Sequence, residues 1–108
     1  DGSFRIYTTE GVNFEGVYNY ALEQNYPNPF NPSTSINYSI PVSGNVNLKV
    51  YNLLGSEVAV LVDEYKEAGN YSVEFSTEDL KSNLGSGVYI YTLKSGSFTQ
   101  TRKMVVLK

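Results

Sequence analysis

Three residue types are missing from the 108 residues of this chain: cysteine, histidine and tryptophan. Without cysteine, the chain can form neither a disulfide framework nor a thiolate metal site. Without histidine, it lacks the commonest general base and the commonest transition-metal ligand. Its eight basic and eleven acidic residues give a net charge of −3, the wrong sign for a nucleic-acid-binding surface. The composition therefore excludes most catalytic and metal chemistry, and we expect no cofactor and no nucleic-acid partner.

Long hydrophobic runs are also missing. The longest apolar stretches, residues 58–62 and 104–107, are far shorter than the roughly 20 residues of a membrane-spanning helix. Residues 1–9 lack the basic start and apolar centre of a signal peptide. Because the chain begins with Asp1 rather than methionine, we interpret it as a piece of a longer protein that ends at Lys108. We expect no insertion into a membrane.

What the sequence has in quantity is apolar residues with a period of two, which is typical of β-strands with one buried face. Ile36, Tyr38 and Ile40 alternate with polar residues, and the same alternation recurs at 45–51 and 70–76. Turns rich in glycine, asparagine and proline separate these runs, including a Ser–Gly pair at 95–96 that is typical of a tight hairpin. The pattern predicts an all-β, immunoglobulin-like β-sandwich of about seven antiparallel strands.

The predicted strands lie near residues 22–24, 34–40, 45–51, 56–62, 70–76, 87–94 and 97–107. Residues 76–80 begin like a helix cap and predict one helical turn between the two sheets. Residues 1–21 are interrupted by glycine and asparagine, and we interpret them as a linker or the end of a preceding domain, with an added edge strand as an alternative. The predicted interior comprises Leu22, Ile36, Tyr38, Ile40, Val46, Leu48, Val50, Val58, Val60, Tyr71, Val73, Phe75, Leu80, Val88, Ile90 and Met104.

Residues 22–34 hold three of the four prolines of the chain. Each proline fixes φ at about −65° and removes a backbone donor, which predicts a stiff, mostly extended crossing that pins the first strand. Tyr26 and Phe30 are its predicted apolar anchors. Asn25, Asn28 and Asn31 are predicted to hydrogen-bond neighbouring backbone groups.

Four segments, in order, resemble the C-terminal sorting domains of the type IX secretion system. Residues 22–41 resemble the opening of that family, 50–55 its central hairpin, 85–91 its penultimate strand and 103–108 its basic and apolar ending. The resemblance covers about residues 22–108, which we take as one domain. It implies a sorting motif at Asn25, Tyr26, Pro27, Asn28, Pro29, Phe30, Asn31, Pro32, Gly87, Tyr89, Lys103, Val105, Val106 and Lys108.

The resemblance implies a non-enzymatic module that directs a larger cargo across the outer membrane of Bacteroidetes-type bacteria. It implies recognition in the periplasm by the type IX translocon and its shuttle protein, and in many cases removal by a sortase-like protease. The cargo would then be at the cell surface or outside the cell. Pairing of the sheet edges into a dimer is left open.

The terminal segment 101–108 has two readings. In the first it is only a last strand, with Met104 and Val106 in the core and Arg102, Lys103 and Lys108 in solvent. In the second, which the resemblance favours, the strand is also part of the surface that the translocon recognises.

Other candidate sites have plainer explanations. The carboxylate pairs Asp63/Glu64 and Glu78/Asp79 are interpreted as solvated charges, because neighbouring side chains on a strand point to opposite faces and no calcium-loop spacing is present. Tyr89 and Tyr91 share one face of a predicted strand. Their ordinary role is to cover a sheet, and the alternative is a sugar-stacking platform in a carbohydrate-binding accessory module. A passive structural spacer is the third possibility.

Overall fold

The alternating runs form β-strands that pair into two sheets. The computed structural model describes residues 18–79 and 84–107. In them the chain forms seven strands and one short 3₁₀ helix, in the order β1 (Ala21–Leu22), β2 (Ser33–Ile40), β3 (Gly44–Tyr51), β4 (Glu57–Lys66), β5 (Gly69–Ser76), η1 (Thr77–Asp79), β6 (Gly87–Ser95) and β7 (Phe98–Val106). The predicted strands are confirmed, although β1 covers residues 21–22 rather than 22–24, and β4 extends four residues beyond its predicted end at residue 62.

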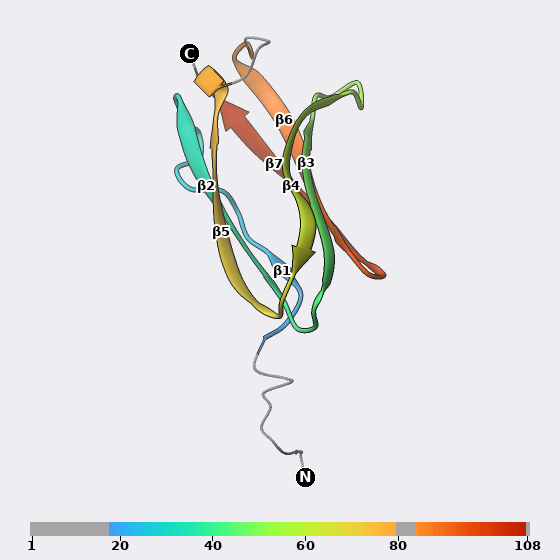
Figure 1. Cartoon of the computed structure of the whole chain (residues 1–108). Coiled ribbons are helices and arrows are strands. Elements are labelled where there is room, and N and C mark those ends of the chain that lie inside the picture. Colours follow the sequence, from blue (N-terminus) through green and yellow to red (C-terminus); the bar gives the residue numbers. More distant parts are fainter. Residues whose placement is uncertain (1–17, 80–83, 108) are drawn as a thin grey trace, which may run out of the picture.

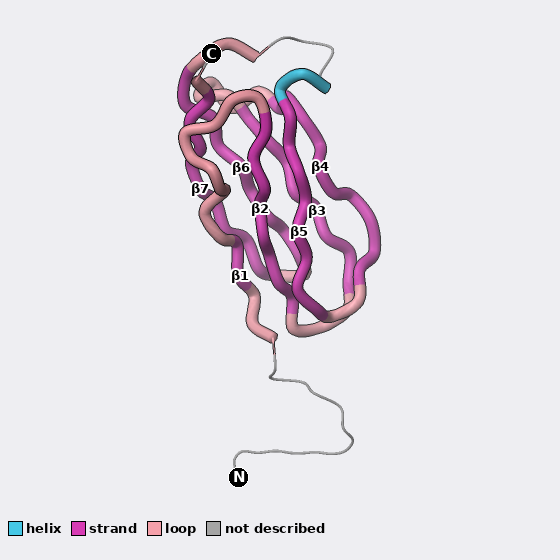
Figure 2. Tube along the Cα trace, turned by 90° about the vertical axis from the view of Figure 1, so that its left-hand side faces the viewer, coloured by secondary structure: helices cyan, strands magenta, loops and turns pink. Residues whose placement is uncertain are grey.

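The two sheets face each other as a sandwich (Figure 1). The first sheet has the strand order β1-β2-β5 and the second has the order β4-β3-β6-β7, with every pairing between these strands antiparallel. In Figure 2, β1 and β7 lie along one edge of the sandwich, and β4 and β5 lie along the other. The predicted all-β sandwich is therefore confirmed.

Two predicted turns are present at the ends of strands. Gly96 has a φ of 59° in the two-residue turn that closes the β6–β7 hairpin between Ser95 and Phe98. Glycine adopts this left-handed conformation without the steric cost of a Cβ atom. The predicted helical turn is η1, where the Ser76 hydroxyl accepts a hydrogen bond from the Glu78 backbone N–H at 3.2 Å.

The core lies between the inner faces of the sheets. Nine of the predicted interior residues are buried: Leu22, Ile36, Tyr38, Ile40, Val46, Leu48, Val50, Phe75 and Met104. The core also contains six residues that are outside the predicted interior set: Phe30, Val62, Leu84, Tyr91, Leu93 and Val106.

 Val106 is buried, as expected for the terminal segment. Tyr71 and Val73 are half-buried against this cluster, and Leu80 lies outside the described residues.

The predicted face of β4 is wrong at Val60, whose side chain is 47% exposed. Val50 pairs with Ala59 and Leu48 pairs with Val62, so Leu61 is an extra residue in β4. Such a bulge shifts the alternation by one position, and Val62 reaches the core instead of Val60. Val58 is only half-buried.

The predicted face of β6 is also wrong. Tyr91 and Leu93 pair with the inward-facing Val50 and Leu48, so they enter the core, and Val88 and Ile90 lie on the outer face. Val88 is 37% exposed and Ile90 is half-buried. Residues 88–91 are apolar or aromatic on both faces, and a period of two cannot choose between two such faces.

The core assignment predicts a large difference between two alanine substitutions. Phe75→Ala removes a ring that is 2% exposed and is expected to lower the free energy of unfolding by about 3–5 kcal/mol. Val60→Ala, on the outer face, is expected to cost less than about 1 kcal/mol. Urea unfolding monitored by circular dichroism measures both, and equal losses would contradict this register.

Candidate functional site

The proline-rich segment between β1 and β2 is bent rather than extended, so the predicted extended crossing is wrong. Bends lie at residues 27–29 and 31–32, and the peptide bonds before Pro27, Pro29 and Pro32 are cis. The chain has to reverse here because β1 and β2 are antiparallel neighbours. The Tyr26 and Ser35 backbones pair within this reversal through two hydrogen bonds of 2.9 and 2.8 Å.

Phe30 carries this segment across to the other sheet. Its backbone N–H donates to the Val105 carbonyl at 3.0 Å, and its carbonyl accepts from the Leu107 N–H at 2.9 Å, which makes a parallel bridge between Phe30 and Val106. Its ring is 2% exposed and meets the Phe75 ring edge to face, with the ring centroids 6.0 Å apart. Phe30 is therefore an apolar anchor, as predicted.

Tyr26 is not an anchor, because its side chain is 81% exposed. It lies opposite Ser35 in an antiparallel bridge, and Ser35 is on the exposed face of β2. Directly opposed residues point to the same side of a sheet, so Tyr26 points to solvent.

The three asparagines behave differently. Asn25 is 2% exposed, and its amide nitrogen donates to the Pro27 carbonyl at 3.1 Å and to the Thr34 hydroxyl at 3.0 Å. The Asn28 side-chain oxygen instead accepts a hydrogen bond from the Val105 N–H at 2.9 Å, across to β7. Asn31 is exposed, and its side chain makes no hydrogen bond with the described residues. The predicted local bonding thus holds for Asn25 but not for Asn28 or Asn31.

Side chains join β1 to β7 along the same edge. The Gln100 side-chain oxygen accepts from the Leu22 N–H at 3.2 Å, and Arg102 Nε donates to the Leu22 carbonyl at 2.5 Å. Gln24 Nε2 donates to the Lys103 carbonyl at 2.7 Å. We call this line of contacts, which joins residues 22–30 to residues 100–107 and to Tyr91, the seam.

The Tyr91 hydroxyl is the buried part of the seam. It accepts a hydrogen bond from the Asn25 N–H at 2.8 Å and donates one to the Glu23 carbonyl at 2.7 Å. Burial raises the pKa of Tyr91 above its usual value, and the Asn25 hydrogen bond and the Arg102 charge oppose this rise. A neutral phenol can make both bonds at once, so this position needs a protonated hydroxyl.

The residues of the implied sorting motif meet at one end of the sandwich. Gly87 pairs with Val106, and Tyr89 pairs with Met104, so the start of β6 lies beside the end of β7 and the Phe30 bridge. Gly87 has a φ of 149°, in the region that favours glycine. Lys103 is exposed, Val105 is half-buried and Val106 is buried, whereas Lys108 lies outside the described residues.

Two residues of the seam, Gln24 and Gln100, were missed by the sequence analysis. The placement of a third, Arg102, in solvent is wrong, because Arg102 is half-buried against β1. Their hydrogen bonds join positions 78 to 80 residues apart. Locally each has the pattern of a solvated polar residue on a strand or loop. No signal in a single sequence distinguishes them from such residues.

Tyr89 and Tyr91 do not form a sugar-stacking platform. They share a face, as predicted, but it is the inner face of the sheet, and Tyr91 is 0% exposed. Tyr89 is half-buried, and its hydroxyl donates to the Gly85 carbonyl at 3.0 Å. A ring covered by the opposite sheet cannot stack on a sugar.

The carboxylates are not organised for catalysis in the described part of the chain. Asp63, Glu64 and Glu78 are exposed, and Glu64 pairs with Lys66 at 2.8 Å. The described residues contain no group of three or more acidic residues placed to hold a metal ion. They also contain no helix long and apolar enough to cross a membrane.

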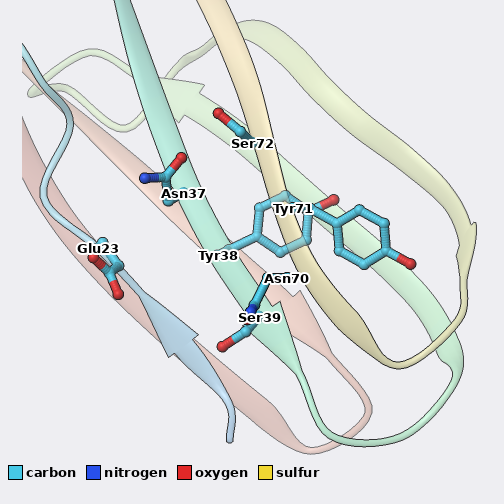
Figure 3. Close-up of a pocket in the computed structure, with 7 residues that line it drawn as sticks. All are labelled: Glu23, Asn37, Tyr38, Ser39, Asn70, Tyr71 and Ser72. Carbon is cyan, nitrogen blue, oxygen red and sulfur yellow. The ribbon is translucent and has the colours of Figure 1, made fainter. Parts of the chain in front are cut away.

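A hollow lies on the outer face of the first sheet (Figure 3). It has a volume of about 410 Å³ and contains one carboxylate, Glu23, and no lysine or arginine. Hydroxyl and amide groups make up most of the remaining polar lining. Such a set offers hydrogen bonds but no nucleophile paired with a base. The lining residues are Glu23, Asn37, Tyr38, Ser39, Asn70, Tyr71 and Ser72.

Comparison with known proteins assigns this arrangement to a family. A family profile described as "Secretion system C-terminal sorting domain" matches residues 24–107. The chain belongs to this family. It is a type IX C-terminal sorting domain, a secretion signal that directs the export of cargo, and it is itself non-catalytic. The family implies that the sorting domain interacts with the type IX machinery and that its cargo is secreted.

A solved structure supports the fold. The crystal structure of dimeric latent PorU from Porphyromonas gingivalis matches with a TM-score of 0.59 and 18% sequence identity. The match covers 92% of this chain and 10% of the PorU chain, so the sorting domain spans a small part of that protein. No match was found among curated proteins.

The buried hydroxyl of Tyr91 predicts a loss of stability on its removal. Tyr91→Phe leaves the Asn25 N–H and the Glu23 carbonyl without this partner, which is expected to cost about 1–3 kcal/mol in the free energy of unfolding. Tyr89→Phe is the matched control, because water can replace its exposed hydrogen bond, and should change stability by less than about 0.5 kcal/mol. Chemical denaturation measures both, and similar losses in the two variants would rule out the proposed role of the seam hydroxyl.

The raised pKa of Tyr91 also predicts how stability depends on alkaline pH. Above a pH of about 10, unfolded tyrosine loses its proton while the buried hydroxyl keeps it, so the unfolded state binds fewer protons and stability falls as pH rises. This fall should be shallower in Tyr91→Phe. Burial raises the pKa of Tyr38 as well, so Tyr38→Phe should act in the same direction. Denaturation curves measured between neutral and alkaline pH test this, and curves parallel to the parent's would contradict it.

Proposed function

We propose that the sorting signal is a folded surface assembled from three segments, residues 25–32, 87–89 and 103–108, and that the type IX shuttle protein and translocon recognise it in the periplasm. The observation that supports this most is the Phe30–Val106 bridge, because it joins two parts of the motif that are far apart in the sequence. The Asn28 side chain adds a second link between them. A linear tail would need no such links.

The motif divides into two groups on this proposal. Asn25, Phe30 and Val106 are buried and hold the segments together, so stability alone explains why they belong to the motif. Tyr26 and Lys103 are exposed and remain available to a partner. Pro27, Pro29, Asn31 and Pro32 shape the exposed loop between the anchors. The second reading of the terminal strand, as a strand and a signal together, is the one we propose.

The proposal also covers the course of export. Residues 22–108 are the sorting domain, and residues 1–21 are a linker or the end of a preceding domain. After passage through the outer membrane, a sortase-like protease removes the domain and leaves the cargo at the cell surface or outside the cell. The extent of the family match, 24–107, supports this division of the chain.

A truncated fusion tests the proposal. A reporter cargo fused to this chain should reach the medium of a type IX-competent bacterium, and deletion of residues 103–108 should leave it in the periplasm. Fractionation and immunoblotting measure the distribution. Full export of the truncated fusion would refute the proposal. Because the deletion also removes the core residues Met104 and Val106, a milder variant is needed beside it.

That variant is Asn28→Ala, with Asn70→Ala as its matched control. Both asparagines are exposed, but only Asn28 bonds to β7 among the described residues, and Asn70 lies outside the three segments of the proposed signal. Loss of this bond is expected to weaken the link by about 0.5–1.5 kcal/mol and to lower export, with little change in the circular dichroism spectrum. Equal export of the two variants would show that the seam is not part of the signal.

A further inference from the structure

The outer faces of the two sheets differ in chemistry. On the first sheet, the outward positions of β2 and β5 are hydroxyl, amide or carboxylate groups: Ser35, Asn37, Ser39, Asn70, Ser72 and Glu74. On the second sheet, Val60 and Val88 are 47% and 37% exposed, and Tyr51, Ile90 and Val105 are half-buried beside them. A protein with an exposed apolar patch on one outer face and a polar surface on the other typically binds a partner through the apolar face, which here belongs to the second sheet.

The apolar residues form neighbouring rows across the second sheet. Tyr51 lies opposite Ile90, and Ile90 lies opposite Lys103. Val88 lies opposite Val105 in the next row toward the start of β6. Direct cross-strand neighbours on one face have their Cβ atoms about 4.5–5.5 Å apart, so these side chains make one continuous surface.

Charge distinguishes the two faces as well. Lys49, Lys94 and Lys103 lie on the outer face of the second sheet, whereas the outward positions of β2 and β5 carry no cation. Lys49 pairs with Glu57 at 3.3 Å, and Asp63 lies opposite Asn47 on the same face. Lys94 and Lys103 have no ion pair with the described residues. These lysines gather on one face of a chain whose net charge is −3.

A hollow of about 150 Å³ lies among these lysines, lined by Asn47, Lys49, Tyr51, Thr92 and Lys94. Thr92 is shorter than the side chains around it, which accounts for the depression, and its hydroxyl lies 3.0 Å from that of Thr101. The Lys94 ammonium group, which has no ion pair with the described residues, and the Asn47 amide at the rim suit a carboxylate side chain, which accepts charge-assisted hydrogen bonds.

From these observations we infer that the outer face of the β4-β3-β6-β7 sheet binds the type IX translocon, and that the translocon surface it meets carries carboxylates around an apolar centre. This inference rests on the proposed function, because Lys103 and Val105 belong both to this face and to the sorting motif. Apolar contact supplies the interface centre, and the lysines at its rim set orientation and the association rate. The outward positions of β2 and β5 are left free.

Matched charge reversals on the two faces test the inference in the full chain fused to a cargo. Lys94→Glu should slow association with purified translocon roughly tenfold at low salt, with a smaller difference at high salt because ions screen the charges. Glu74→Lys, an equal reversal on the other outer face, should leave the rate unchanged. Export kinetics from a pulse-chase experiment should follow the same order. Equal rates for Lys94→Glu and the parent would overturn the inference.

A second pair of variants tests the apolar part. Val88→Ser should slow export, and Val42→Ser, at a 52% exposed site in the β2–β3 turn, should not. Thermal melting of each variant within a few degrees of the parent confirms that it folds. If Val42→Ser slows export as much as Val88→Ser, the inference is overturned.

The outcomes separate the two proposals. A parent fusion that is not exported would refute the proposed function itself. A parent fusion that is exported as fast with Lys94→Glu and Val88→Ser as without them would refute the docking face alone. Concentration-dependent dimerisation of the parent that Lys94→Glu abolishes, measured by sedimentation, would also overturn the inference, because a second copy would then cover this face.

Discussion

The backbone pairing of Phe30 with the end of β7 is the contact on which the rest of this domain depends. The connection between β1 and β2 would otherwise be a surface loop, with its polar backbone groups in water. Here it crosses from one sheet to the other and buries a phenylalanine ring between them. The Tyr91 hydroxyl and the Asn28 side chain then satisfy neighbouring backbone groups. One edge of the sandwich is closed in this way, and the motif residues are gathered there.

Much of the fold could be predicted from the sequence because its strands are strongly alternating. Ile36, Tyr38 and Ile40 leave little choice of face, and they are buried as expected. The prediction failed where alternation was ambiguous or interrupted. Both faces of β6 are apolar near Ile90, and the bulge at Leu61 is a property of the pairing with β3, which the sequence of β4 alone does not contain.

The candidate site was less predictable than the fold. The proline-rich segment could be singled out by its composition, and Phe30 was correctly expected to be an anchor. Which strand Phe30 would meet could not be predicted, since its partner is more than seventy residues away. Tyr26 and Phe30 are both aromatic, but Tyr26 pairs with Ser35 and is exposed, whereas Phe30 pairs with Val106 and is buried. Such long-range choices depend on tertiary structure rather than on local preference.

The seam has a consequence for the order of synthesis and folding. Its two sides come from distant parts of the domain, and the side-chain hydrogen bonds between them span 66 to 80 residues. Neighbouring hairpins such as β6–β7 can close early, whereas pairings of such large sequence separation carry a high entropic cost. In a nascent chain that stops before β7, Phe30 has no strand with which to pair. Tyr91 then lies on β6 without the neighbouring strand that completes this edge of the sheet. The seam can therefore close only after every strand of the domain has been synthesised, because β7 is the last of them.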